Sequence, residues 1–191
     1  FEKKLAMNAG LGWIGKHTNL VSKELGSWFF LSEIFLSENF ESDNEEFDKC
    51  GDCKKCLDIC PTNAFVGAYK MDAKKCISYL TIESYGPFPV SLREKIGNKI
   101  FGCDDCLSVC PWNKFSNEST EQGFKANEKY LTTSLKYFLN LKEEDFKEFF
   151  FDSPIRRIGW ERLMRNVIIA AGNSRNESFV IELKKFLKNK Y

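Results

Sequence analysis

The stretch "CGDCKKCLDICP", residues 50–61, decides how this sequence is interpreted. Its cysteines follow the spacing C-x2-C-x2-C-x3-C-P, which is the ligand run of bacterial proteins that hold [4Fe–4S] clusters in pairs. Three thiolates on one short loop can each bind a different iron of one cluster. The fourth cysteine, Cys60, is carried away by the following turn and held there by Pro61. The spacing therefore predicts that Cys60 binds a second cluster.

A second run, "CDDCLSVCP" at residues 103–111, repeats the last three cysteines and the proline of the first. It lacks one cysteine, and Cys76 alone among the eight remains unassigned. We therefore expect two complete sets of four ligands, with Cys76 as the detached member. The predicted cluster-one cysteines are Cys50, Cys53, Cys56 and Cys110, and the predicted cluster-two cysteines are Cys60, Cys76, Cys103 and Cys106.

Zinc sites and reduced structural thiols are the alternatives to iron–sulfur clusters. Zinc sites pair two C-x2-C knuckles, which explains neither a third cysteine at the same interval nor the two Cys-Pro pairs. All eight cysteines lie between Cys50 and Cys110, which argues against a small secreted protein held together by disulfides. The favoured clusters imply one-electron transfer, so the chain either feeds electrons to a reaction or relays them.

Composition narrows the class of protein. The 28 Lys and Arg residues nearly balance the 27 Asp and Glu residues, so net charge indicates no partner. Residues 37–48 carry six acids and no base, which is typical of a solvated linker. No apolar run approaches the roughly 20 residues of a membrane helix. We expect a cytoplasmic, monomeric protein without membrane association, and, because the chain begins at Phe1 rather than methionine, part of a longer one.

The stretch "GLGWIG", residues 10–15, fits the G-x-G-x-x-G pattern of dinucleotide-binding turns. That pattern needs a strand before it and a helix after it. Residues 1–9 instead predict a helix that ends at Gly10. The β-rich "SWFFLSEIF", residues 27–35, predicts two short strands after it. This context argues against a dinucleotide site.

Six segments together resemble the epoxyqueuosine reductase family in order and spacing. They are "AGLGWIGKHTNL" (9–20), "GSWFFLSEIFL" (26–36), "CGDCKKCLDICPTNAF" (50–65), "CISYLTIE" (76–83), "FGCDDCLSVCPWN" (101–113) and "SPIRRIGWERLMRNVIIAAGN" (153–173). The resemblance implies reduction of epoxyqueuosine to queuosine in a tRNA anticodon, with cobalamin, two [4Fe–4S] clusters and an external electron donor. It also implies that the proton-donating Asp precedes Phe1, so no catalytic residue is expected within this chain.

The resemblance also implies an α+β architecture in three parts. Residues 1–47 would be the C-terminal part of a cobalamin-binding α/β domain, 48–118 a ferredoxin-like domain with two [4Fe–4S] clusters, and 119–191 a helical, HEAT-like domain. The last part begins its main helix at Ser153, with Pro154 in the first turn, and ends it at Gly172. Apolar residues within 134–153 predict further helices before it.

Several polar and apolar residues are candidate cobalamin contacts on this resemblance. Hydroxyl, amide and carboxylate groups can bond the amides that fringe the corrin ring, and leucines can cover its face. His17, the only histidine, is expected to contact the corrin side chains rather than to bind cobalt. The predicted cofactor-binding set is His17, Thr18, Asn19, Leu20, Leu31, Ser78, Asp104 and Asp105.

The C-terminal 39 residues, 153–191, are strongly basic, with nine Lys and Arg against three Glu. Such a charge excess suits RNA phosphates, although a solvated helical face is the plainer interpretation. The predicted phosphate contacts are Arg156, Arg157, Arg162 and Arg165, beside Arg175, Lys184, Lys185, Lys188 and Lys190. A stand-alone two-cluster electron carrier and a cobalamin-dependent reductase of another substrate remain as alternative functions, and the basic tail argues against both.

Overall fold

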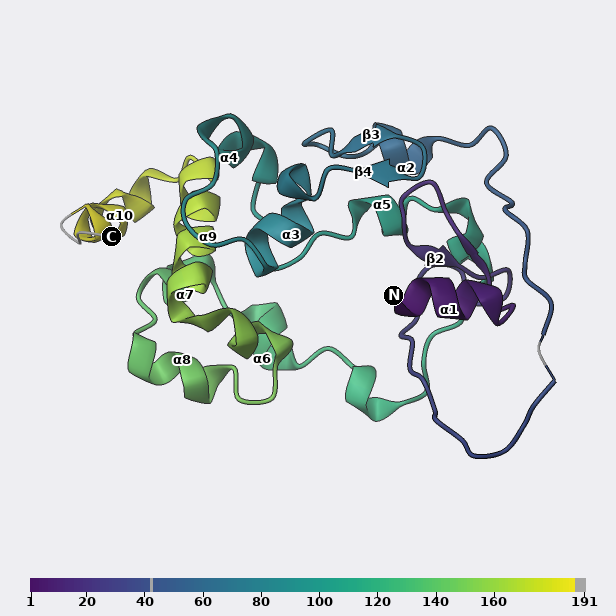
Figure 1. The fold of residues 1–191 in the computed structure, drawn as a ribbon. Helices are drawn as coiled ribbons and strands as arrows, with labels where there is room; N and C mark the ends of the chain where they lie inside the picture. The colour runs from purple at the N-terminus through teal and green to yellow at the C-terminus, as the bar shows by residue number, and fades with distance from the viewer. Residues whose placement is uncertain (42, 188–191) are drawn as a thin grey trace. The chain divides into compact units, whose positions relative to one another are not determined.

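A computed structural model of the chain describes residues 1–41 and 43–187 (Figure 1). Helices make up most of the regular secondary structure of the described residues, together with two short antiparallel hairpins. They form two compact units, and neither is a continuous stretch of sequence. The N-terminal unit combines Phe1–Asp72 with Asp104–Thr120, and the C-terminal unit combines Ala73–Cys103 with Glu121–Tyr191.

The N-terminal unit is built from short elements. In the first hairpin Trp13 pairs with Val21, and in the second Phe65 pairs with Met71. The first helix packs against both strands of the first hairpin. The elements are α1 (Glu2–Asn8), β1 (Trp13–Ile14), β2 (Leu20–Val21), α2 (Lys55–Asp58), β3 (Phe65–Gly67), β4 (Lys70–Met71), α5 (Asp105–Ser108) and the 3-10 turn η2 (Pro111–Phe115).

The sequence prediction around "GLGWIG" holds on one side only. The helix before it is confirmed as α1, and Gly10 follows with the positive φ of +71° that glycine tolerates. The two strands predicted in 27–35 are wrong, because residues 28–41 form neither helix nor strand. Aromatic and β-branched residues only favour a pleated surface, and no other strand of the described chain pairs with this segment. Ile34 and Phe35 are 80% and 95% exposed.

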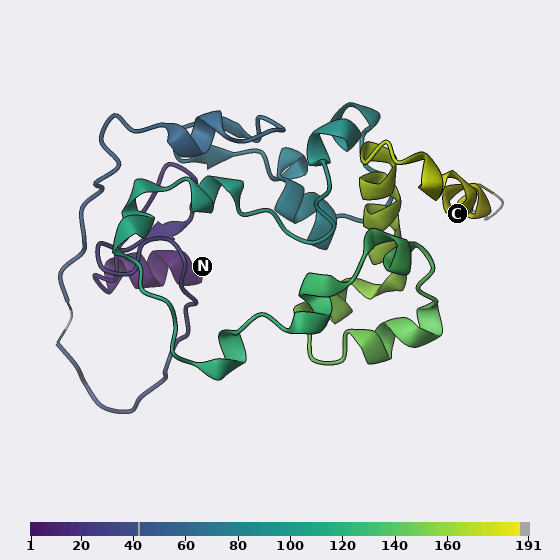
Figure 2. The same cartoon turned by 180° about the vertical axis from the view of Figure 1, so that it is seen from behind.

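The segment 104–120 is tied to the first hairpin by packing and hydrogen bonds, and Figure 2 shows the two side by side from behind. Trp13, 1% exposed, meets Trp112 edge to face with ring centroids 5.0 Å apart. The Ser27 N–H donates to Asn113 Oδ1 at 2.9 Å. Asn113 Nδ2 in turn donates to the Leu107 carbonyl at 2.6 Å. These bonds place the second cysteine run against the N-terminal hairpin.

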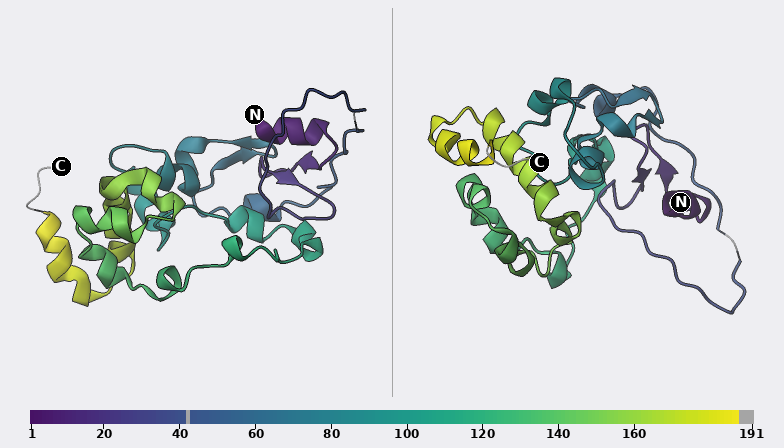
Figure 3. Two further views of the ribbon diagram at one scale, coloured as in Figure 1. Left: turned by 90° about the horizontal axis from the view of Figure 1, so that it is seen from below. Right: turned by 60° about the vertical axis from the view of Figure 1, so that its left-hand side comes forward.

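The C-terminal unit is organised around its longest helix, α9, which contacts α3, α4 and α7 (Figure 3). The predicted start of the main helix at Ser153 is wrong, because Ser153 Oγ accepts the Ile155 N–H at 3.3 Å and caps a separate 3-10 turn, η4, while α9 begins at Gly159 and runs through Gly172 to Asn173. The elements are η1 (Ala73–Lys75), α3 (Ile77–Ile82), α4 (Val90–Ile96), η3 (Gln122–Phe124), α6 (Glu128–Thr132), α7 (Leu135–Leu139), α8 (Glu143–Phe149), η4 (Pro154–Ile158), α9 (Gly159–Asn173), η5 (Glu177–Phe179) and α10 (Val180–Phe186).

One face of α9 is buried in the core of this unit, with Leu163 and Val167 both at 0% exposure. The same face carries Asn166, which is also fully buried. Asn166 Nδ2 donates to the Thr81 carbonyl at 2.8 Å and to the Ile100 carbonyl at 2.9 Å. A buried amide is stable only when its donors are paired, so these bonds join α9 firmly to α3 and to the segment after α4.

The division into units differs from the predicted boundary at residues 48–118. The segment Ala73–Cys103 belongs with the C-terminal helices because its apolar side chains form a core with α9. Ile77 and Phe88, each 2% exposed, lie in that core with Ile169 of α9 packed against it. The HEAT-like character of the helices remains a prediction. No helix within the described part of the chain is long and apolar enough to cross a membrane.

Candidate metal centre

The first three cluster-one cysteines lie on one tight loop that leads into α2. Gly51 turns the chain with a φ of +49°, and the Cys53 N–H donates to the Cys50 carbonyl at 3.1 Å. Cys56 follows within α2 and is buried. The fourth member, Cys110, comes from the second run at the start of η2. The structure thus draws on two distant segments of the N-terminal unit to assemble this set.

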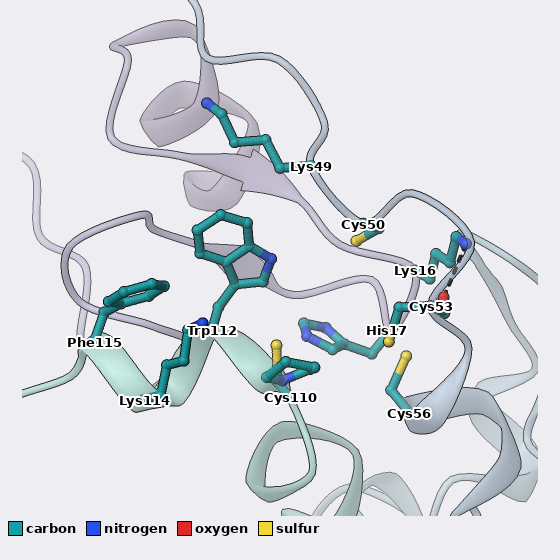
Figure 4. Close-up of a pocket in the computed structure, with 11 residues that line it drawn as sticks. Lys16, His17, Lys49, Cys50, Cys53, Cys56, Cys110, Trp112, Lys114 and Phe115 are labelled. Atoms are coloured by element: carbon teal, nitrogen blue, oxygen red, sulfur yellow. Dashed lines mark hydrogen bonds between the residues drawn. The ribbon is translucent and has the colours of Figure 1, made fainter.

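All four cluster-one cysteines line a single cavity of about 300 Å³ (Figure 4). The wall is completed by cationic and aromatic side chains together with one proline. The convergence of the four thiols is the arrangement that the cysteine spacing predicts. The other lining residues are Lys16, His17, Lys49, Pro111, Trp112, Lys114 and Phe115.

Burial disfavours ionisation of three of the thiols in this cavity when no metal is bound. Burial raises the pKa of the Cys56 thiol to about 11, and negative charge on the other three cluster-one cysteines adds to the rise. Burial also raises the pKa of Cys50 and of Cys110. Metal centres bind thiolates rather than thiols, so a cationic centre that neutralises four converging sulfurs would remove this penalty.

The loop backbone is fixed by two charged side chains. Lys16 Nζ donates to the Gly51 carbonyl and, at 2.9 Å, to the Cys53 carbonyl. Asp48 Oδ1 accepts the Cys50 N–H at 2.9 Å. Lys16 therefore lines the cavity and also binds the backbone carbonyl groups of the loop. These hydrogen bonds hold the sulfur atoms of the loop in position.

Two buried N–H groups at this centre lack a partner. Among the described residues, only Trp13 Nε1, His17 Nε2 and Glu182 Oε2 are buried side-chain polar atoms without a hydrogen bond. An unpaired buried donor lowers the free energy of unfolding by about 1–3 kcal/mol. We therefore expect a hydrogen-bond acceptor next to the two nitrogens. Burial, followed by the positive charge of Lys3, lowers the pKa of His17 to about 4, so its ring is neutral at pH 7. Neutral donors facing thiols fit a sulfur-rich, anionic cluster.

The cluster-two cysteines are divided between the units. Cys60 and Cys106 belong to the N-terminal unit, and Cys76 and Cys103 to the C-terminal unit. The Ala64 N–H donates to Cys60 Sγ at 3.3 Å. Within residues 1–41 and 43–187, no group of three or more His, Cys, Asp or Glu side chains is placed to hold a single metal ion. The assignment of the second set stays a prediction from spacing.

The predicted cobalamin contacts are only partly brought together. Asn19, Leu20 and Leu31 line one small cavity of about 110 Å³, with Lys3 beside them. Lys3 Nζ donates to Asn19 Oδ1 at 3.2 Å. The His17 side chain is not part of this cavity, because it is 2% exposed and lines the cluster-one cavity instead.

The remaining predicted contacts lie elsewhere in the chain. Thr18 sits in the turn between β1 and β2 with a φ of +66°. Asp104 and Asp105 begin α5 in the N-terminal unit, and burial together with the charge of Asp105 raises the pKa of Asp104. Ser78 lies in α3 of the C-terminal unit. None of these four residues lines the cavity of Asn19, Leu20 and Leu31.

Arg165, one of the predicted phosphate contacts, is bonded to backbone carbonyl groups of the chain itself. Its Nη1 donates to the Ser84 and Gly86 carbonyls at 2.8 and 2.7 Å, and its Nη2 donates to the Leu80 carbonyl at 2.9 Å. The guanidinium also lies 4.0 Å from the Phe88 ring centroid. Burial lowers the pKa of Arg165 to about 10. This side chain joins α9 to the segment after α3, so it is no longer a candidate for RNA.

Arg162 has a similar structural role. It donates to the Ile82 carbonyl at 2.8 Å and to the Ile158 carbonyl at 2.6 Å, and it lies over the Tyr85 ring. Arg162 therefore also leaves the predicted RNA-binding set.

The other two predicted arginines are more open. Arg157 pairs with Glu83 at the surface, and Arg156 lies over the exposed Phe151 ring. These two remain candidates for phosphate contact. Lys188 and Lys190 lie outside the described residues.

Sequence reasoning missed the residues that surround the cluster-one sulfurs. Trp13, Lys16 and Trp112 are not among the predicted site residues, yet they pack against or hold the cysteine loops. Two signals were present. Trp112 follows a Cys-Pro pair directly, and Trp13 lies within the glycine-rich stretch 10–15, which Lys16 and the only histidine follow.

Comparison with protein families supports the cysteine assignment at the level of cluster type. Residues 49–113 match the sequence model of a 4Fe-4S double cluster binding domain. The matched range includes all eight cysteines. The chain therefore contains an iron–sulfur domain of the two-cluster kind.

Comparison with whole proteins identifies the family. The chain is 46% identical over 173 residues to an epoxyqueuosine reductase of Xanthomonas campestris, covering 91% of this chain and 49% of that protein. It is 45% identical over 185 residues to an epoxyqueuosine reductase of Pseudomonas aeruginosa, covering 96% of this chain and 51% of that protein. The chain belongs to the epoxyqueuosine reductase family. It spans about half the length of these relatives.

Solved structures of epoxyqueuosine reductases agree with this assignment. The Bacillus subtilis enzyme matches the whole chain with a TM-score of 0.92 at 33% identity, and this match covers 51% of its own length. A crystal structure of an epoxyqueuosine reductase with an epoxyqueuosine-modified tRNA stem loop matches equally, with a TM-score of 0.92, 33% identity and 50% coverage. The fold of this chain is thus that of one half of an epoxyqueuosine reductase.

Proposed function

We propose that this chain is the cluster-bearing part of an enzyme that reduces epoxyqueuosine to queuosine in a tRNA anticodon. The observation that carries the proposal is the cavity formed by the four cluster-one cysteines. It lies in a chain that is about 45% identical to named epoxyqueuosine reductases. A two-cluster domain explains how such a protein receives electrons. Membership of the family indicates that these electrons reduce epoxyqueuosine.

The chemistry of the reaction suits this equipment. Removal of an epoxide oxygen as water consumes two electrons and two protons. The cluster-one and cluster-two cysteines would hold two [4Fe–4S] clusters, which would provide one-electron transfer from an external donor. Cobalamin, when bound, supplies the strongly reducing cobalt centre for breaking the carbon–oxygen bond. The chain's own residues hold the clusters, exclude water from cluster one and present a surface to the cofactor.

The cavity lined by Asn19, Leu20 and Leu31 is our candidate for part of the cobalamin surface. Amide and lysine groups there can bond the amides of the corrin edge, and the leucines can cover apolar ring atoms. At about 110 Å³ the cavity takes one edge or side chain of the cofactor and not all of it, since whole-ligand pockets start near 300 Å³. Thr18, Ser78, Asp104 and Asp105 stay as predicted contacts, and no proton donor is assigned within the chain.

Arg156 and Arg157 are our candidates for contacts to tRNA phosphates. Both are surface side chains in η4, and neither guanidinium is enclosed by carbonyl groups as Arg162 and Arg165 are. Phosphate contacts position a protein on RNA without selecting its sequence, so selectivity would rest with the pocket for the modified base. We place this reaction in the cytoplasm, with a monomeric enzyme.

The test follows the modified nucleoside. The protein that carries this chain is reconstituted anaerobically with iron, sulfide and cobalamin, then incubated with a reductant and tRNA that bears epoxyqueuosine. Mass analysis of the nucleosides should show the loss of one oxygen atom, and the variant Cys56→Ala should abolish this loss. A protein that takes up both clusters and cycles its electrons but leaves epoxyqueuosine unchanged would support the stand-alone electron carrier instead.

A further inference from the structure

The only histidine of the chain presents an unused donor to the cluster-one cavity. His17 is 2% exposed, and Figure 4 shows its ring among the sulfur atoms of the cluster-one cysteines. The Asn19 N–H donates to His17 Nδ1 at 3.1 Å. A neutral imidazole that accepts at Nδ1 carries its proton on Nε2. The Nε2–H group is buried at the cavity without a hydrogen-bond partner.

The ring is held in this position by the first hairpin. A Cβ atom placed on Gly15 would lie 3.1 Å from His17 Cε1 and 3.3 Å from His17 Nε2. The same atom would lie 2.9 Å from Val21 Cγ2. Gly15 therefore leaves the space in which the imidazole packs, and a larger residue there would displace the ring.

Trp13 offers a second donor of the same kind. Its side chain is 1% exposed, and Nε1 has no hydrogen-bond partner. The Trp13 ring meets Trp112, which lines the cluster-one cavity, edge to face with ring centroids 5.0 Å apart. Lys49, another residue of the cavity wall, places its Nζ 5.4 Å from the Trp13 ring centroid. The indole donor is therefore buried next to the cluster-one cavity.

We propose that His17 Nε2–H and Trp13 Nε1–H donate hydrogen bonds to sulfur atoms of a [4Fe–4S] cluster held by the cluster-one cysteines. Reduction adds one negative charge, which spreads over the cluster and its sulfur ligands. A donor aimed at sulfur stabilises the reduced form more than the oxidised form and so raises the reduction potential. His17 and Trp13 are thus positioning and tuning residues of cluster one, and this role replaces the cobalamin contact predicted for His17.

The first experiment measures the potential of each cluster by redox titration followed by electron paramagnetic resonance. Trp13→Phe removes the indole donor and keeps an aromatic ring, and His17→Phe removes the imidazole donor. Each should lower the ratio of reduced to oxidised cluster one at a fixed solution potential by about tenfold, which is about 59 mV for one electron. His17→Gln, which retains an N–H donor, should restore part of the loss. Gly15→Ala should act in the same direction as His17→Phe because it displaces the ring.

The matched control is Trp160→Phe. Trp160 Nε1 donates to the Leu141 carbonyl at 2.9 Å within the C-terminal unit. This variant also loses one indole donor, but cluster one should keep its potential. Equal shifts in Trp160→Phe and Trp13→Phe would overturn the proposal, as would unchanged potentials in both the Trp13→Phe and His17→Phe proteins.

A second experiment uses isotope labelling. Within these 191 residues His17 is the only histidine, so protein grown on ¹⁵N-labelled histidine and purified without a histidine tag carries the label there, and the His17→Phe protein labelled in the same way identifies the His17 signal by difference. Pulsed electron paramagnetic resonance of reduced cluster one should show coupling to this nitrogen and to an exchangeable proton. The absence of both couplings would refute the hydrogen bond. The inference rests on the proposed cluster one, and iron and sulfide analysis of the same samples shows separately whether that cluster is present.

Discussion

The two units differ in how their buried side-chain N–H donors are paired. In the C-terminal unit the fully buried Asn166 gives both amide hydrogens to carbonyl oxygens, and Arg165 is surrounded by three more carbonyls. In the N-terminal unit, Trp13 and His17 each bury an N–H group that no described protein atom accepts. Paired groups indicate a structural role that the chain completes by itself. Unpaired groups beside four converging thiols indicate a place for something that is not protein.

The largest expected effect is loss of a cluster. Anaerobic reconstitution should give about eight iron and eight sulfide per chain. Cys56→Ala and Cys76→Ala should each lose about half of the iron, and they should lose different halves, because the two residues belong to different predicted ligand sets. Elemental analysis with electron paramagnetic resonance of both variants measures this. Two zinc ions and little iron per chain, or loss of the same paramagnetic signal in both variants, would contradict the two predicted iron–sulfur ligand sets.

The next effect concerns the buried amide of the C-terminal unit. Asn166→Ala leaves the Thr81 and Ile100 carbonyls buried and unpaired, and should lower the free energy of unfolding by about 2–4 kcal/mol. Asn173, near the end of the same helix, also bonds two carbonyls but is only half-buried. Asn173→Ala should cost about 1 kcal/mol because water can replace its amide. Urea unfolding compares the two, and equal losses would mean that burial does not matter here.

A smaller effect depends on pH and on His17. Its pKa in the folded protein, about 4, lies below its ordinary value of 6.5 because burial disfavours the charged ring. The unfolded chain therefore takes up the proton first, so this contribution to stability is complete above pH 6.5 and declines as the pH falls toward 4. Between pH 7 and 5 the protein should lose about 2 kcal/mol more than His17→Gln does. Anaerobic urea unfolding at both pH values provides the comparison, and parallel losses would show that the ring is not buried neutral.

The smallest effect separates exposed from structural arginines. Arg156→Glu should weaken tRNA binding and reduce the slope of log affinity against log salt by roughly 0.7 to 0.9, the value of one phosphate contact. Lys142→Glu is the matched control, since Lys142 pairs with Glu144 on the same unit and is also exposed to solvent. Titrations at several salt concentrations decide the matter. An unchanged slope for Arg156→Glu would mean that Arg156 contacts no phosphate and interacts only with solvent.

The sequence was most informative where function depends on spacing. Cysteine intervals predicted which four thiols belong to cluster one, and the structure brings Cys110 to the same cavity as the loop around Cys53. Local signals worked in part, because Gly10 follows the end of α1 and Ser153 caps the 3-10 turn before α9. Both kinds of signal act over a few residues or through one repeated chemistry, so they can be read without the fold.

Other features depend on contacts that the sequence does not encode locally. Charge suggested that Arg162 and Arg165 contact RNA, but which carbonyl groups surround a guanidinium follows from the packing of α9 against α3. The strands predicted near Phe35 need a partner edge, and propensity alone cannot supply one. The sequence did not indicate that the His17 ring lies at the cluster-one cavity, because its burial there depends on the space left by Gly15.

The discontinuity of the N-terminal unit has a consequence for biosynthesis. The ribosome produces the loop with Cys50, Cys53 and Cys56 first, then all of Ala73–Cys103, and only afterwards the segment that holds Cys110. Until Asp104–Thr120 emerges, Trp13 lacks its neighbour Trp112 and the three early cysteines lack their fourth companion. This metal centre can therefore be completed only after the ribosome has synthesised the chain past Cys110. By then the residues Ala73–Cys103, which belong to the other unit, have already been made.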